Sequence, residues 1–190
     1  MQTKTKFIIF IVLVVLIVGG IGAYFGLKPQ APGKLDEFAK ALTDRGTKFY
    51  GAFWCTHCKA QKAEFGTSKQ YLPYVECSSK DGGEQLQICK DNKIEGYPTW
   101  SFKDEIKITS NSEPTICPIV PEGETPTSEC TYTSSKYFKV WVFPGYTFTV
   151  KSSTDPIKNG NIWTFPAGSL TSGEVPLSYL AEQIGFTLPQ

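Results

Sequence analysis

The sequence predicts an α/β sandwich with a partly parallel central sheet and a β-rich insertion, preceded by one N-terminal transmembrane helix. Three observations support this fold class. An apolar run without charged residues occupies residues 7–27. Segments with helix and strand patterns alternate over residues 34–102, an order typical of α/β folds. Residues 103–161 have no helical period and are rich in Ser, Thr and Pro, which indicates a differently built insertion.

The run at residues 7–27 is long enough to cross a membrane as a helix. A helix rises about 1.5 Å per residue, and the hydrocarbon core is about 30 Å thick. Lys4 and Lys6 precede the run, so the positive-inside rule places residues 1–6 in the cytoplasm. We therefore expect a single-pass protein of the cell membrane whose C-terminal domain is extracytoplasmic, with residues 28–33 as a linker.

A cleaved secretory signal is the alternative interpretation of this run. Residues 20–23 offer the small side chains that a cleavage site needs. An uncleaved anchor is favoured because the apolar run is longer than a usual signal sequence. Lys28 and Lys34 weaken the charge asymmetry, but both interpretations place the folded part outside the cytoplasm.

The folded part begins with an amphipathic helix. Leu35, Phe38, Ala39 and Leu42 follow the i, i+3, i+4, i+7 spacing of a helix that Gly46 can end. The next segments alternate between strand and helix patterns, judged from aromatic and apolar runs and from helix formers. We expect strands within 47–53, 71–77 and 96–102, and helices over 58–65, 83–92 and 176–184.

The insertion, residues 103–161, contains a candidate β-hairpin. Two alternating runs, residues 137–143 and 146–150, are joined by Pro144 and Gly145, which are typical turn residues. A structureless loop as long as this insertion would be unusual. We therefore interpret it as β-rich, with the main domain formed by residues 34–102 and 162–190.

Charge and cysteine content limit the class of protein. The formal net charge is +1, which argues against a nucleic-acid binder. Six cysteines occur, all beyond residue 50 and in three closely spaced pairs. An even number in a small domain fits a disulfide-bearing, extracytoplasmic protein, although six unrelated buried thiols are the alternative.

Cys55 and Cys58 form a C-x-x-C motif at the end of a predicted strand, where a helix opens. Unpaired N–H groups at a helix N-terminus stabilise a thiolate on the first cysteine. Cys55 is therefore the candidate nucleophile and Cys58 the resolving thiol. This pattern predicts thiol–disulfide exchange without a cofactor.

His57, the one histidine of the chain, lies between these cysteines. An imidazole that carries charge favours thiolate over thiol, so we expect His57 to tune the pKa of the thiol and make the pair more oxidising. An exposed polar residue without a role is the alternative. A zinc site would need two further ligands, and no second C-x-x-C or C-x-x-H exists. Lys59 excludes the haem-attachment pattern, so no metal is expected.

Three segments resemble a known family: residues 53–62, with Phe-Trp-Cys-Thr-His-Cys; residues 72–77, with Leu-Pro-Tyr-Val-Glu-Cys; and residues 94–100, with Ile-Glu-Gly-Tyr-Pro-Thr-Trp. Together they resemble the thioredoxin-like domain fused to, or partnering, bacterial vitamin K epoxide reductase homologues. The similarity covers about residues 35–102 and resumes at 163–186. It implies a thioredoxin-like three-layer sandwich.

The resemblance also implies roles for individual residues. Pro98 matches the family's cis-proline, which faces the C-x-x-C and shapes a substrate groove with Tyr97 and Trp54; a trans turn proline is the alternative on the sequence alone. Cys77 and Cys89 match a structural disulfide of the family. Cys117 and Cys130 lie outside the resemblance, and we pair them by proximity.

Two positions depart from the family pattern. Many relatives carry a buried acid six residues before the first cysteine, where this chain has Phe49. The proline of the family's C-P-H-C is replaced by Thr56. The first change leaves open how Cys58 exchanges its proton, and the second can alter the reduction potential.

The resemblance implies that exported cysteine-containing proteins are the substrates and that a quinone-linked membrane oxidase recharges the pair. Two alternatives stay open at this stage. The chain could act as a disulfide reductase or isomerase, because fold and motif are common to both directions. It could also be a non-catalytic, anchored binding protein that uses the β-hairpin to hold a partner.

Overall fold

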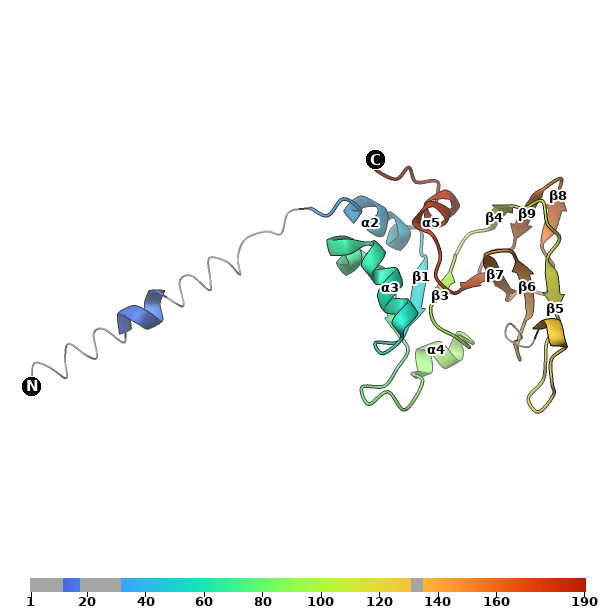
Figure 1. Cartoon of the computed structure of the whole chain (residues 1–190), viewed down its shortest axis with the longest axis horizontal. Helices are drawn as coiled ribbons and strands as arrows, with labels where there is room; N and C mark the ends of the chain where they lie inside the picture. The colour runs from blue at the N-terminus through green and yellow to red at the C-terminus, as the bar shows by residue number, and fades with distance from the viewer. Residues whose placement is uncertain (1–11, 18–31, 131–134) are drawn as a thin grey trace, which may run out of the picture. The chain divides into compact units, whose positions relative to one another are not determined.

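A computed structural model describes residues 12–17, 32–130 and 135–190 (Figure 1). The chain divides into two compact units, Met1–Pro32 and Gly33–Gln190. In the first unit, residues 12–17 are helical and their side chains are exposed. Among the residues that the structure describes, no helix has the length and apolar character needed to cross a bilayer. Most of the predicted anchor, 7–27, and the N-terminal residues 1–6 lie outside the described residues.

The second unit contains the expected alternation of helices and strands. Its first half runs α2 (Asp36–Asp44), β1 (Lys48–Gly51), α3 (Thr56–Glu64), η1 (Gly66–Tyr71), β2 (Tyr74–Glu76), α4 (Gln87–Asp91) and β3 (Thr99–Ser101). The predicted helices and strands of this half are confirmed; α3 begins two residues earlier than predicted, and the other elements have shorter bounds. Gly46, at φ +70°, follows α2 as expected. The 3₁₀ helix η1 was not predicted.

The second half is β-rich, as expected. It runs β4 (Ile106–Thr109), β5 (Thr115–Cys117), η2 (Ser128–Cys130), β6 (Lys139–Phe143), β7 (Tyr146–Val150), β8 (Ile157–Asn159), β9 (Ile162–Phe165), β10 (Leu170–Ser172) and α5 (Leu177–Gln183). The predicted hairpin is β6 and β7, and Gly145 in its turn has φ +85°. The final helix is α5.

The strands form two sheets. The first has seven strands in the order β2-β1-β3-β10-β7-β6-β5, and the second has three in the order β4-β9-β8. In the first sheet β1 and β2 are parallel and the remaining neighbours are antiparallel, so the expected partly parallel sheet is confirmed. Strands of the insertion continue the central sheet beyond β10, as Figure 1 shows on the right.

Strand β9 lies in the segment 162–190 but pairs with β4 and β8 of the insertion. Its aromatic side chains pack against the hairpin. The ring centroids of Trp163 and Phe143 are 5.5 Å apart, and those of Phe165 and Phe148 are 4.4 Å apart. This aromatic contact joins the second sheet to the first.

Helices cover both faces of the central sheet. Phe49 and Tyr50 are neighbours in β1, so their side chains point to opposite faces. Phe49 belongs to the large core that contains buried residues of α2, α3 and α5. Tyr50 packs with Cys89 of α4 in a second cluster. The unit is therefore a three-layer α/β sandwich, and the C-x-x-C motif follows β1 at the edge of this core.

Candidate functional site

Cys55 is the N-cap residue of α3, four residues after the end of β1. Its Sγ accepts a hydrogen bond from the backbone N–H of Cys58 at 3.1 Å. That N–H is one of the groups at a helix start that lack a partner within the helix. A thiolate at Cys55 would receive this N–H bond and the positive end of the helix dipole. The structure therefore places the predicted nucleophile where negative charge on sulfur is stabilised.

Cys58 lies one turn further into α3 and has a different environment. Its side chain is 1% exposed, compared with 7% for Cys55. Burial, followed by the hydrogen bond to Cys55, raises the pKa of the Cys58 thiol to about 12. Both cysteines are free. A slightly exposed thiol at the helix start, with a more deeply buried and protonated thiol behind it, is the arrangement expected for a nucleophile and a resolving cysteine.

The residues expected to shape a substrate groove lie together beside the motif. The Tyr97–Pro98 peptide bond is cis. The rings of Tyr97 and Trp54 meet edge to face, with centroids 6.0 Å apart. Trp54 is 50% exposed and its neighbour Phe53 is 47% exposed. These exposed aromatic side chains offer an apolar surface next to Cys55 on which a polypeptide can bind.

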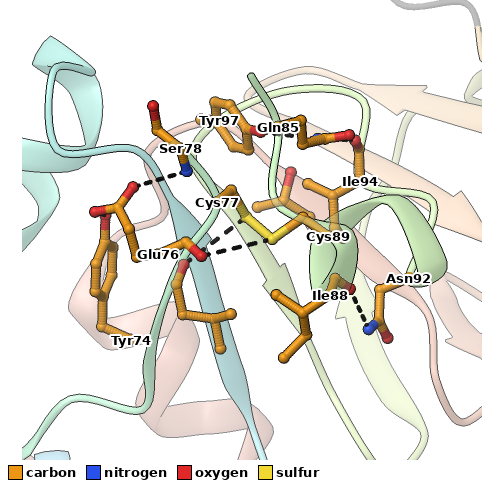
Figure 2. The surroundings of a disulfide bond; sticks show 12 residues. Tyr74, Glu76, Cys77, Ser78, Gln85, Ile88, Cys89, Asn92, Ile94 and Tyr97 are labelled. Atoms are coloured by element: carbon orange, nitrogen blue, oxygen red, sulfur yellow. Dashed lines mark hydrogen bonds between the residues drawn. A yellow bond between two sulfur atoms is a disulfide. The ribbon is translucent and has the colours of Figure 1, made fainter. Parts of the chain in front are cut away.

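The loop between Cys77 and Cys89 borders this surface. The two cysteines form a disulfide (Figure 2). Ser78 Oγ accepts a hydrogen bond from Trp54 Nε1 at 2.8 Å. A Cβ atom at Gly82 would lie 3.5 Å from Trp54 Cδ1. The disulfide therefore anchors a loop that holds Trp54, a contact that sequence patterns did not indicate.

Tyr97 is held from the same loop. Gln85 Nε2 donates hydrogen bonds to the Tyr97 hydroxyl at 2.8 Å and to the Ile94 carbonyl at 2.7 Å (Figure 2). On the other side of the proline, the Pro98 carbonyl accepts a bond from Gly173 N–H at 2.9 Å. The cis-proline segment is thus fixed between the disulfide loop and the strand end after β10.

Glu174 reaches the motif from the C-terminal part of the chain. His57 Nδ1 lies 2.6 Å from Glu174 Oε1, and the side chains are 72% and 39% exposed. This carboxylate was not among the predicted site residues, because 117 residues separate the two side chains and no local pattern connects them. The contact places a carboxylate beside the imidazole that lies between the two cysteines.

At the position where many relatives carry a buried acid, this chain has Phe49, which belongs to an aromatic stack. Phe49 stacks on Trp100 with centroids 4.5 Å apart. Close by, the fully buried Gln61 donates to the Val175 carbonyl at 3.0 Å and accepts from the Val175 N–H at 2.7 Å. It also accepts a bond from Trp100 Nε1 at 3.4 Å. Gln61 connects α3 to the segment before α5 but carries no charge, so it does not replace the missing acid.

Cys117 and Cys130 form the second disulfide. They belong to a separate small cluster with Val140, in the β-rich part of the chain. The pairing agrees with the one proposed from proximity, and it is a structural crosslink of the insertion. Over the described residues, no three His, Cys, Asp or Glu side chains gather as metal ligands would.

Comparison with known proteins agrees with this geometry. Residues 35–115 match the Thioredoxin family model. The chain contains a thioredoxin domain. A thiol-disulfide oxidoreductase, LTO1 of Arabidopsis thaliana, is 47% identical over 72 residues, which is 36% of this chain and 19% of that protein. The chain thus spans about a fifth of the length of the curated relative that it matches. The thioredoxin domain and this relative support the expected oxidoreductase activity.

Proposed function

We propose that this chain is a membrane-anchored, extracytoplasmic thiol–disulfide oxidoreductase that passes disulfides to exported proteins. The observation that carries the proposal is the arrangement of the two free cysteines. Cys55 caps α3 and is 7% exposed, and Cys58, which is 1% exposed, lies one turn further into the helix. The relative's name describes the same type of reaction.

Transfer of a disulfide proceeds through a mixed disulfide. A substrate thiolate attacks Cys55 Sγ of the oxidised pair, and Cys58 leaves as a thiolate that is then protonated. A second substrate thiolate attacks the substrate sulfur of the mixed disulfide and displaces Cys55. The substrate has then lost two electrons, and the pair has gained them as two thiols.

Two features support an oxidising compartment. The thioredoxin domain and its insertion carry two structural disulfides, which are typical of extracytoplasmic proteins. The uncharged run at residues 7–27 follows two lysines, an order that favours a cytoplasmic N-terminus and an exported domain. We propose that this run is the membrane anchor.

After each transfer the pair must be reoxidised by a group that accepts two electrons. We propose a quinone-linked membrane oxidase resembling vitamin K epoxide reductase. Anchoring would confine both proteins to one membrane, which raises their effective concentration for each other. Exported proteins with paired cysteines would be the substrates, bound over Trp54 and beside Pro98.

The transfer is tested with the oxidised full chain in mild detergent and a fluorescent peptide that carries two cysteines. The wild-type protein should convert the peptide to its disulfide with equimolar reduction of Cys55 and Cys58. Cys55→Ser should abolish the conversion. Full turnover without Cys55 would exclude the proposal, and reduction of disulfides at the expense of glutathione would favour a reductase.

The proposed location is tested in cells that express the Cys58→Ser variant. In this variant Cys55 cannot form a disulfide with residue 58, so its thiol can be labelled. A membrane-impermeant maleimide should label Cys55 in intact cells, and the labelled protein should sediment with membranes. Labelling only after lysis would contradict an extracytoplasmic domain.

A further inference from the structure

Cys58 must carry a negative charge whenever the Cys55–Cys58 disulfide forms or breaks, although its surroundings disfavour that charge. The side chain is buried, and burial is the main reason that its pKa lies at about 12. The acid found in many thioredoxin-like proteins is replaced by Phe49, whose ring is stacked on Trp100. Another group near Cys58 is needed to stabilise its thiolate.

Lys62 lies one helical turn after Cys58. Both belong to α3 and are four residues apart, so they lie on the same face of the helix. The Lys62 ammonium lies over the ring of Tyr74, with Nζ 3.1 Å from the ring centroid. A cation in this position is attracted to the face of the ring. The partly buried Lys62 is thereby directed towards β2 and away from open solvent.

The Tyr74 ring also borders Cys58. A Cβ atom at Gly51 would lie 2.8 Å from Tyr74 Cε2 and 2.9 Å from Cys58 Sγ. The tyrosine ring and the thiol therefore pack against the same backbone position at the end of β1. Any residue other than glycine at position 51 would push them from this position, so Gly51 permits the close approach.

Glu76 completes the cluster from the neighbouring strand. It is paired in register with Gly51. One carboxylate oxygen accepts a hydrogen bond from the Tyr74 hydroxyl at 3.0 Å, and the other accepts from Ser78 N–H at 3.0 Å (Figure 2). The second oxygen also accepts from Phe53 N–H at 3.1 Å. Both oxygens are thus fixed, and the negative charge lies close enough to Lys62 to favour its protonated form.

We propose that Lys62 supplies the positive charge that stabilises the Cys58 thiolate, with Tyr74 and Glu76 positioning its ammonium group. The inference rests on the proposed exchange function. Lys62 acts in both directions of that reaction, because Cys58 is the attacking thiolate in one direction and the leaving thiolate in the other.

When the pair reduces a substrate disulfide, Cys58 is the attacking thiolate. Cys55 is joined to a substrate sulfur in a mixed disulfide, and the Cys58 thiol releases its proton to solvent. The Cys58 thiolate attacks Cys55 Sγ, so the Cys55–Cys58 bond forms and the bond from Cys55 to the substrate breaks. The substrate sulfur leaves as a thiolate and takes up a proton. Two electrons have passed from the cysteine pair to the substrate disulfide.

The electrostatics of the cluster agree with this role. The positive charge of Lys62 lowers the pKa of Cys58 against the larger opposite effect of burial. Burial lowers the pKa of Lys62, while the charges of Glu76 and Cys58 raise it. Around Cys58, the titratable groups are Cys55 at the N-cap of α3, Lys62 on α3, Tyr74 and Glu76 on β2, and Tyr97 before β3.

The test follows the two thiols separately with 4,4′-dithiodipyridine, an uncharged disulfide probe. Attack by Cys55 of the reduced full chain releases a first thiopyridone, and attack by Cys58 on the mixed disulfide releases a second. In Lys62→Met the first rate should stay within about twofold of wild type. The second should fall about tenfold at pH 7, equivalent to a rise of about one unit in the pKa of Cys58.

Two variants serve as controls. Lys62→Arg keeps the charge and should keep the second rate within about threefold of wild type. Lys59→Met removes an exposed lysine of the same helix and should change neither rate. The curve of the second release rate against pH should shift to higher pH only in Lys62→Met. If that variant does not fold, Lys62→Gln is measured in the same way.

An unchanged second rate in Lys62→Met would overturn the inference. Equal slowing of both releases would also overturn it, because a general structural defect would affect Cys55 as well. The inference would also be overturned if the second release were as slow in Lys62→Arg as in Lys62→Met. The effect would then come from the packing of the side chain and not from its charge. A wild-type protein that releases no second thiopyridone would contradict the proposed exchange function itself.

Discussion

His57 Nδ1 lies 2.6 Å from a carboxylate oxygen of Glu174, a residue of the segment between β10 and α5. The pair joins the C-x-x-C helix to the C-terminal part of the chain. Glu174 thereby places a carboxylate beside the imidazole of the C-x-x-C motif. We expect His57 to tune the cysteine pair, and Glu174 should act on the reduction potential through its contact with His57.

We predict that His57→Ala lowers the reduction potential of the pair, since the reduced form loses a stabilising charge. Glu174→Gln should also lower the reduction potential, by up to about 20 mV, because an exposed ion pair contributes up to about 1 kcal/mol. The double variant should resemble His57→Ala alone. Glutathione equilibration measures all three, and additive changes would show that Glu174 acts independently of His57.

Cys55 and Cys58 should react with an alkylating reagent at very different rates. With a pKa of about 12, about one Cys58 side chain in 10⁵ is ionised at pH 7. Iodoacetamide should therefore modify Cys55 of the reduced protein well before Cys58. Labelling of Cys58 should increase about tenfold for each pH unit between 7 and 9, since the thiolate fraction rises with pH below the pKa. Peptide mapping by mass spectrometry measures both sites, and equal labelling at pH 7 would contradict the assignment.

Gln61 should be important for stability. Gln61→Leu removes the partners of the Val175 N–H and carbonyl groups and of Trp100 Nε1. Leaving buried polar groups without partners costs about 1–3 kcal/mol each in the worst case, so we expect a loss of about 2–4 kcal/mol in the free energy of unfolding. Urea denaturation measures the loss. Gln70→Leu, at an exposed position, is the matched control and should change stability by less than about 0.5 kcal/mol.

Loss of either disulfide should lower stability, but only loss of the Cys77–Cys89 disulfide should also lower activity. They close loops of similar length, with sequence separations of 12 and 13, so loss of either should cost about 3 kcal/mol in the chain-entropy model. Only the Cys77–Cys89 loop contacts Trp54. Cys77→Ala with Cys89→Ala should therefore also slow peptide oxidation, whereas Cys117→Ala with Cys130→Ala should not. Equal loss of activity in both double variants would contradict a groove role for the first loop.

Local sequence patterns were sufficient for elements whose signals lie within a few residues. The spacing of Phe38, Ala39 and Leu42 predicted α2, and Pro144-Gly145 between two alternating runs predicted the hairpin of β6 and β7. The C-x-x-C motif located Cys55 and Cys58 at a helix start. In each case the turn, the period or the cap is determined by neighbouring residues.

These local patterns could not predict which distant strands and side chains come together. Nothing local to Thr171 or Phe148 indicates that β10 pairs with β7 and so continues the central sheet into the insertion. The contact of His57 with Glu174 and that of Cys58 with the Lys62 and Tyr74 cluster depend equally on how distant segments pack. The helical spacing of Cys58 and Lys62 was visible in the sequence, but the ring of Tyr74 that holds the ammonium was not.

The reduction potential of Cys55 and Cys58 decides whether they form a disulfide-donating pair. The full chain, in mild detergent, is equilibrated with glutathione buffers, and the oxidised fraction is measured after acid quenching and alkylation. We expect a potential between about −120 and about −180 mV, the range of proteins that give disulfides to others. A value near about −270 mV, the range of a reductant, would contradict it.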